Sequence, residues 1–167
     1  TGNKKQQLGG LDEDLFGQVM KTNVYGPLKL SEIFTENVAA SQQKKIVGIT
    51  SGLGSLTLMG KMSRFYYYQM SKAALNMVLK SAAVEYRRRL PRVKLLAFHP
   101  GTTDTALSRP FQRGVAPHSL FTPAFVARRL AQLLEHMRGS NGFPALSAQM
   151  VQVQQVASSE TDNLNRL

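Results

Sequence analysis

The stretch FYYYQMSKAALNMVLKSAAVEYRRRL, residues 65–90, is followed directly by Pro91. Alanine, leucine and methionine, which recur through this stretch, favour an α-helix, whereas proline ends one. We therefore predict a long helix over residues 65–90. This helix and the elements around it decide the class of fold.

The three tyrosines at the start of this helix differ in which residues they face. On a helix, residues three or four apart share a face, and Lys72 lies four residues after Tyr68. Only Tyr68 is thus expected to hold its phenol beside an ammonium ion. We interpret Tyr66 and Tyr67 as packing residues, because aromatic side chains near a core usually contribute buried area.

Apolar runs on both sides of this helix predict strands. KKIVGIT predicts a buried parallel strand over about 45–50, and VKLLAFH predicts another over 93–99, stopped by Pro100-Gly101. Helical spacing of apolar residues predicts two further helices, over 11–39 with a bend at Gly26-Pro27, and over 122–137 with Thr122 as N-cap.

The order helix, strand, helix, strand, helix predicts an α/β fold with a doubly wound parallel sheet. Two strands are fewer than such sheets usually contain. We therefore expect the C-terminal half of a larger fold, or a sheet completed by association. We treat residues 1–167 as one domain, with a flexible start over 1–10 and a divergent tail over 138–167.

Composition restricts the class of protein. Hydrophobic residues make up 43% and charged residues 19% of the 167 residues, as in a globular α/β domain. The chain has no cysteine, so disulfides and thiolate metal sites are excluded, and we expect no metal. No apolar run approaches the ~20 residues of a membrane span, and the start TGNKKQQLGG does not resemble a signal peptide. We expect a cytoplasmic protein.

The net charge of +11 raises the question of an anionic partner. The densest basic cluster falls where the helix over 65–90 ends, and the helix dipole favours cations there. Aromatic residues do not alternate with these charges, as stacking on nucleic-acid bases would require. Nucleic-acid binding therefore stays a rival hypothesis, which salt-dependent retention on DNA would test.

Polar residues follow both predicted strands. Ser51 comes after the first strand and His99-Pro100-Gly101 ends the second, and ligands of open α/β sheets bind beyond these carboxyl ends. An ammonium ion ~5 Å from a phenolate stabilises it by roughly 3 kcal/mol at an effective dielectric near 20. Tyr68 and Lys72 therefore suit proton transfer, and a redox reaction here would need a cofactor to carry the hydride.

These motifs together closely resemble the short-chain dehydrogenase/reductase family, in particular its small carbonyl-reductase-like bacterial branch. The resemblance covers about residues 11–137. It implies a Rossmann-type sheet of which this chain holds the C-terminal half. Four elements occur in family order: Asn23 in KTNVYGP, Ser51 after KIVGIT, Tyr68-Gln-Met-Ser-Lys72, and Pro100-Gly101 ahead of Thr105.

The resemblance also implies roles and ligands. Tyr68 would be the catalytic acid/base, and Lys72 would promote ionisation of its phenol and hold the nicotinamide ribose. Ser51 would orient the substrate oxygen, with Ser55 as an alternative, and Asn23 would keep a water in the proton relay. The cofactor would be NADP or NAD and the substrate a small carbonyl or alcohol. The nicotinamide carboxamide would contact Pro100, Gly101, Thr102, Thr103 and Thr105.

One departure from the family pattern stands out. The Gly-rich nucleotide turn, Thr-Gly-x-x-x-Gly-x-Gly, is not found before Asn23. Gly48, Gly52 and Gly54 fit part of that spacing, but no predicted helix follows them, so we interpret them as belonging to the serine-bearing strand and its loop. A rival hypothesis follows: a truncated, non-catalytic relative that acts as a binding or assembly partner.

Family members commonly pair two long helices across a dimer interface. The corresponding segments here are residues 11–39 and 65–90, so the resemblance implies a homodimer or homotetramer.

Overall fold

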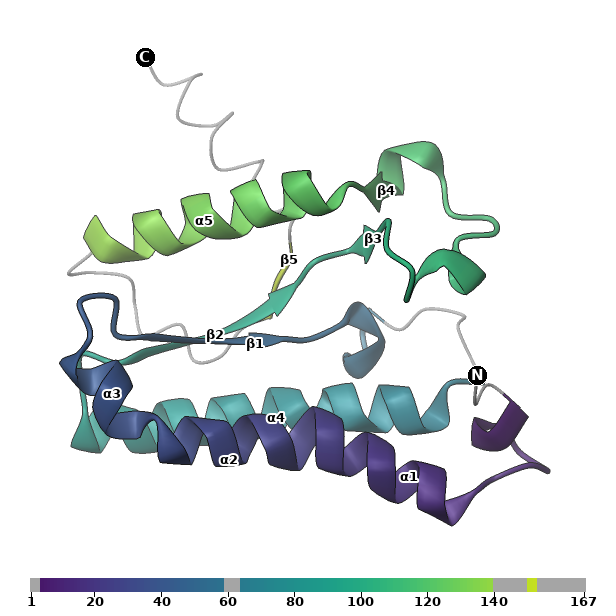
Figure 1. Cartoon of the computed structure of the whole chain (residues 1–167), viewed down its shortest axis with the longest axis horizontal. Coiled ribbons are helices and arrows are strands. Elements are labelled where there is room, and N and C mark those ends of the chain that lie inside the picture. Colours follow the sequence, from purple (N-terminus) through teal and green to yellow (C-terminus); the bar gives the residue numbers. More distant parts are fainter. Residues whose placement is uncertain (1–3, 59–63, 140–149, 153–167) are drawn as a thin grey trace.

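The computed structural model describes residues 4–58, 64–139 and 150–152. A parallel sheet of three strands, in the order β1-β2-β5, lies between two layers of helices. Figure 1 shows α1, α2, α3 and α4 below the sheet and α5 above it. The predicted α/β class, with helices on both faces of a parallel sheet, is confirmed.

The strands lie close to their predicted bounds. β1 (Lys45–Ile49) pairs in parallel with β2 (Lys94–His99), with Lys45 opposite Lys94 and Ile49 opposite Phe98. The third strand, β5 (Met150–Gln152), pairs in parallel with β2 and was not predicted. Its three residues are too few to show a strand pattern against their Gln- and Ser-rich surroundings.

The central helix α4 (Tyr66–Arg89) covers one face of the sheet. Leu75 and Leu79 are buried against β2, and a Cβ built on Gly48 of β1 would lie 2.4 Å from the Leu79 side chain. A side chain at position 48 would therefore require the Leu79 side chain to move. The buried core on this side comprises Leu75, Leu79, Tyr86, Val93, Leu95 and Ala97.

The predicted helix over 11–39 is divided in the structure. It comprises α1 (Glu13–Met20), a π-helical turn (Lys21–Tyr25), α2 (Gly26–Ile33) and α3 (Thr35–Ala40). The Gly26 amide donates to the Lys21 carbonyl, five residues back. Pro27 has no amide hydrogen, so the Asn23 carbonyl cannot receive the usual i+4 bond. The bend expected at Gly26-Pro27 is thus a π-turn that begins five residues earlier.

The upper layer is α5 (Pro123–Gly139). Its predicted N-cap is confirmed, because the Thr122 hydroxyl accepts a hydrogen bond from the Phe125 amide at 3.2 Å. Leu133 and Met137 of α5 pack on Leu96 and Phe98 of β2 to form the second core cluster. The helix continues two residues past its predicted end.

Short elements connect these layers. A second sheet pairs β3 (Thr102–Thr103) in parallel with β4 (Leu120–Phe121). The 3₁₀ turns span Lys4–Gln6, Gly52–Gly54, Arg109–Phe111 and Pro117–Ser119. Of the tail predicted over 138–167, residues 140–149 and 153–167 lie outside the described residues. Within the described part of the chain, no helix is both long and apolar enough to span a membrane.

Candidate active site

Tyr68 and Lys72 lie on the same face of α4, as their spacing predicts. The Lys72 ammonium is 5.7 Å from the centroid of the Tyr68 ring. The same ammonium donates a hydrogen bond to the Ile49 carbonyl at 2.9 Å. Ile49 is the last residue of β1, so Lys72 joins the first turns of α4 to the carboxyl end of the sheet.

Lys72 is partly buried, and this burial disfavours its charged form. Burial lowers the pKa of the Lys72 ammonium, because a partly desolvated cation loses hydration. One carbonyl contact uses one of its three N–H donors. The remaining donors are suited to hydroxyl groups of a ligand bound at this edge.

Ser51 lies directly beyond β1. Its hydroxyl accepts a hydrogen bond from the Leu53 amide at 3.2 Å and so caps the Gly52–Gly54 turn. The neighbouring Thr50 amide donates to the Phe98 carbonyl, which holds this turn beside the end of β2. Ser55, the alternative candidate, follows the turn, and its hydroxyl accepts from the Leu58 amide at 3.3 Å. Both serines are half-buried at this edge.

The Asn23 side chain is hydrogen-bonded to a buried serine of α4. The Asn23 side-chain amide donates to the Ser71 hydroxyl at 3.0 Å, and that hydroxyl donates to the Tyr68 carbonyl at 2.8 Å. Ser71 is 0% exposed. The π-turn is therefore attached to α4 one turn after Tyr68.

The loop after β2 holds the other predicted residues. His99 ends β2, and burial lowers the pKa of its imidazole. Gly101 adopts φ +70, a conformation that favours glycine, and turns the chain into β3. Thr102 and Thr103 are half-buried beside Pro100, whereas Thr105 is exposed and caps a turn with Ser108.

The three glycines near β1 have packing roles. A Cβ on Gly52 would lie 3.0 Å from His99 Nε2, and one on Gly54 would lie 2.6 Å from the Lys72 carbonyl carbon. The Gly54 backbone thus touches the backbone of α4. These contacts explain the glycine spacing without a nucleotide turn, in agreement with the interpretation made from the sequence.

Tyr67 is buried, as expected for a packing residue. Its hydroxyl accepts from the Asp12 amide at 2.7 Å, and its ring meets Phe16 edge to face at 5.5 Å. Tyr66 is half-buried. Among the three tyrosines, the ring of Tyr68 is the one that has an ammonium of a described residue over it.

Sequence reasoning did not identify Ser71 or Gln6 as residues of this region. Gln6 Oε1 accepts from the Tyr68 amide at 3.3 Å. A serine inside a helix commonly bonds to a carbonyl three or four residues back, so the position of Ser71 was a usable signal. Gln6 gave no comparable signal, because its contact depends on the fold. The described residues form no group of His, Cys, Asp and Glu that could hold a metal ion.

Comparison with known proteins gives a consistent result. A sequence profile of the family described as short chain dehydrogenase matches residues 1–115. The C-signal protein of Myxococcus xanthus is 30% identical over 113 residues, covering 68% of this chain and 66% of that protein. A benzil reductase ((S)-benzoin forming) of Bacillus subtilis is 30% identical over 128 residues, covering 68% of this chain and 51% of that protein.

Solved structures share the fold. An NADPH-bound carbonyl reductase from chicken fatty liver has a TM-score of 0.72 at 23% identity, covering 89% of this chain and 58% of that one. A carbonyl reductase from Pseudomonas aeruginosa PAO1 has a TM-score of 0.68 at 24% identity, covering 90% of this chain and 58% of that one. The chain thus spans about half to two thirds of the length of these proteins.

Proposed function

The chain belongs to the short-chain dehydrogenase family. From this premise we propose that it acts as an NAD(P)-dependent oxidoreductase that interconverts a carbonyl group and an alcohol. The observation that carries the proposal is the position of Lys72, which contacts both the Tyr68 ring and the last carbonyl of β1. This contact brings a phenol and an ammonium to the edge where open α/β sheets bind ligands.

The residues present fit the nicotinamide end of a dinucleotide. Lys72 would hold the ribose hydroxyls with the N–H donors that the Ile49 carbonyl does not use. Pro100, Gly101, Thr102, Thr103 and Thr105 would contact the carboxamide. A bound nicotinamide supplies or accepts the hydride. NADP or NAD both suit this proposal, and the chicken carbonyl reductase that shares the fold is NADPH-bound.

Tyr68 would move the proton. In reduction its phenol donates a proton to the substrate oxygen, and in oxidation the phenolate accepts it. The Lys72 ammonium stabilises the phenolate electrostatically. The Ser51 hydroxyl, or that of Ser55, would hold the same substrate oxygen and fix its orientation.

Asn23 would supply the end of the proton relay. Its carbonyl lacks the i+4 donor, because residue 27 is proline. That carbonyl is therefore suited to hold a water that replenishes the proton on Tyr68. Its side chain meanwhile fixes the π-turn to Ser71 of α4.

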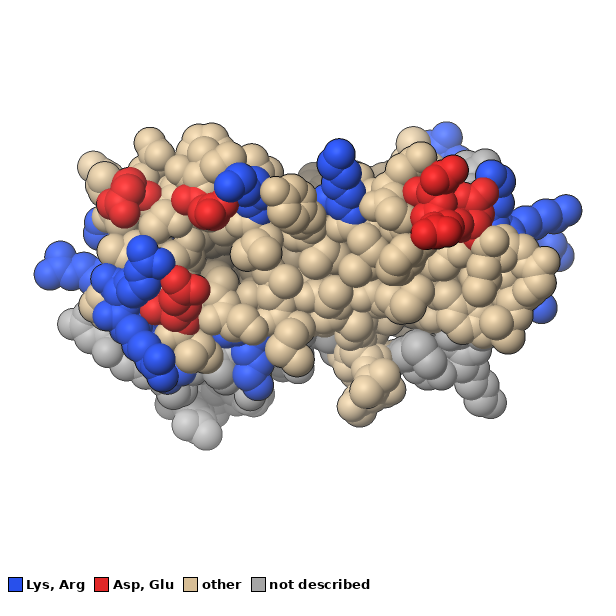
Figure 2. Space-filling model, turned by 90° about the horizontal axis from the view of Figure 1, so that it is seen from below, with Lys and Arg blue, Asp and Glu red and all other residues tan. Residues whose placement is uncertain are grey.

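We further propose a homodimer or homotetramer in which α2 and α4 face a second copy. Met70, Met77 and Val84 recur every seven residues along α4 and are exposed. Leu30 and Ile33 of α2, which are three residues apart and share a face, are also exposed. Figure 2 shows the helical side of the molecule, where charged side chains gather toward the two ends and the middle is largely uncharged. The exposed apolar residues of these helices favour association.

Titration with NADPH and with NADH, followed by nicotinamide fluorescence, tests the proposed function. Saturable binding, together with turnover of a diketone such as benzil, would support an oxidoreductase. Benzil is a suitable first probe because a relative is a benzil reductase. An intact fold with no binding of either cofactor would instead favour the non-catalytic binding or assembly partner.

A further inference from the structure

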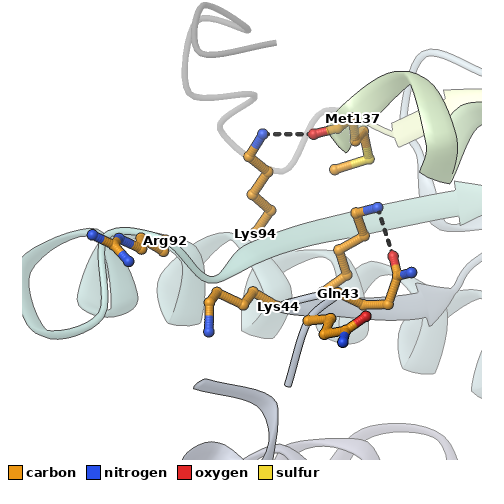
Figure 3. Close-up of a pocket in the computed structure, with 7 residues that line it drawn as sticks. Gln43, Lys44, Arg92, Lys94 and Met137 are labelled. Carbon is orange, nitrogen blue, oxygen red and sulfur yellow. Dashed lines mark hydrogen bonds between the residues drawn. The ribbon is translucent and has the colours of Figure 1, made fainter. Parts of the chain in front are cut away.

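A basic pocket lies at the end of the sheet opposite the candidate active site. It has a volume of about 210 Å³. Figure 3 shows it between the starts of β1 and β2 and the end of α5. The lining residues are Gln42, Gln43, Lys44, Lys45, Arg92, Lys94 and Met137.

Four of these residues are cations, and none is acidic. Lys45 and Lys94 are partners in the register of β1 and β2, so two like charges stand directly opposite each other. Such pairs in a sheet repel. Both ammonium groups donate to carbonyls near the end of α5, Lys45 to that of Leu134 and Lys94 to that of Met137 at 2.7 Å. The contact of Lys94 is drawn in Figure 3.

The other two cations, Lys44 and Arg92, keep more of their N–H donors free of hydrogen bonds within the described part of the chain. Lys44, at φ 50, donates to the Ala39 carbonyl at the end of α3, which uses one of its three N–H donors. Arg92 is exposed and forms no hydrogen bond or ion pair within the described part of the chain. Its N–H donors are therefore available to a ligand, although Figure 3 shows the side chain directed away from Lys44 and Lys94, so it would have to turn toward the pocket.

We propose that this pocket binds a small phosphate-bearing anion. Arg92 and Lys44 would contact the phosphate oxygens directly, since guanidinium and ammonium groups form charge-assisted hydrogen bonds with phosphate. Lys45 and Lys94 would contribute mainly positive potential. The amides of Gln42 and Gln43 add neutral donors at the rim. The volume admits a phosphate group with a small organic substituent.

The competing explanation is that the lysines only cap helices. Lysines near a helix C-terminus do bond to its last carbonyls, and Lys44, Lys45 and Lys94 each make such a contact. Capping does not account for Arg92, which lines the same pocket and bonds to no carbonyl of residues 4–58, 64–139 or 150–152. Among its described lining residues the pocket has four cations and no acidic residue, a distribution of charge that attracts anions.

NMR titration of the ¹⁵N-labelled protein with inorganic phosphate tests this site. Chloride keeps the ionic strength constant, and no nicotinamide cofactor is present. We expect saturable amide shifts confined to residues 42–45 and 92–94. Arg92→Gln should weaken phosphate binding about tenfold, the size of one charge-assisted contact, and Lys44→Gln should add to this effect. Lys80→Gln with Arg113→Gln, which changes exposed charges away from the pocket, should leave binding unchanged.

Other outcomes would overturn the proposal. These are shifts that never saturate, shifts spread over all basic segments, or equal weakening by the Lys80→Gln with Arg113→Gln control. Parallel titrations with pyrophosphate and with a phosphate monoester distinguish a free ion from the phosphate of a metabolite. The readout does not depend on the proposed oxidoreductase activity, so either proposal can fail without the other.

Discussion

The Asn23 side-chain amide lies 3.0 Å from the Ser71 hydroxyl, and this hydrogen bond joins the π-turn to the buried side of α4. Ser71→Ala would leave the Asn23 amide without this acceptor. We expect the free energy of unfolding to fall by about 1–3 kcal/mol, the usual effect of an unsatisfied buried polar group. Urea unfolding measures it. Ser81→Ala, at an exposed position of the same helix, should change stability by less than ~0.5 kcal/mol. Equal stabilities for the two variants would contradict the inferred role of the bond.

The proposed acid/base role of Tyr68 predicts a large kinetic effect. Tyr68→Phe removes the proton donor but keeps the ring, so kcat for benzil reduction should fall by ~10²–10⁴-fold. NADPH binding and the circular dichroism spectrum should be retained. Tyr66→Phe, two residues away, should keep normal turnover. Substantial turnover by Tyr68→Phe would exclude this phenol as the proton donor.

Burial of Lys72 predicts a pH dependence of stability. Burial lowers the pKa of this ammonium below its ordinary value of 10.5, so just below pH 10.5 the unfolded chain binds more protons than the folded one. Its contribution to stability is therefore present above pH 10.5 and is lost as pH falls through the lowered pKa. Relative to Lys72→Met, the wild type should gain stability as pH rises toward 10.5.

Urea unfolding at several pH values between 7 and 10.5 measures this effect. The exposed Lys80→Met variant corrects for the loss of one positive charge on the same helix. If the stability of the wild type relative to Lys72→Met stays constant or falls as pH rises, Lys72 is not desolvated in the fold.

The close approach of Gly54 to α4 predicts that a methyl group is not tolerated there. A Cβ at this position would lie 2.6 Å and 2.8 Å from backbone atoms of Lys72 and Ala73, which cannot rotate away. We expect Gly54→Ala to destabilise the fold by about 1–3 kcal/mol. In Gly17→Ala the new Cβ meets nothing within 4 Å, and this helical variant should gain roughly 0.5–1 kcal/mol. Thermal or urea unfolding compares the pair, and similar stabilities would refute the tight contact.

The exposed apolar stripe on α4 predicts a self-association surface. Met77 is 63% exposed, so Met77→Glu should not disturb the core but should weaken a helix-mediated dimer. Sedimentation velocity should show a shift toward monomer. Leu107→Glu, at another exposed apolar residue outside the helices, should keep the wild-type oligomeric state. A wild-type protein that is monomeric at high concentration would rule out the proposed interface.

Several features could be predicted from local sequence alone. The bounds of α4, β1 and β2 follow from residue types and from Pro91 and Pro100, because these signals act over a few residues. The shared face of Tyr68 and Lys72 follows from helix geometry, since a spacing of four residues places side chains together in any α-helix. The capping of α5 by Thr122 is equally local.

Other features depended on contacts between distant parts of the chain. The carbonyl of Ile49 that binds Lys72 and the amide of Asn23 that binds Ser71 lie 23 and 48 residues from their partners. β5 is a strand because it pairs with the edge of β2 that β1 does not occupy. Its three residues alone do not predict a strand. Sequence therefore determined which groups are available for chemistry, whereas tertiary packing decided which groups meet, because loop closure and burial act across the whole fold.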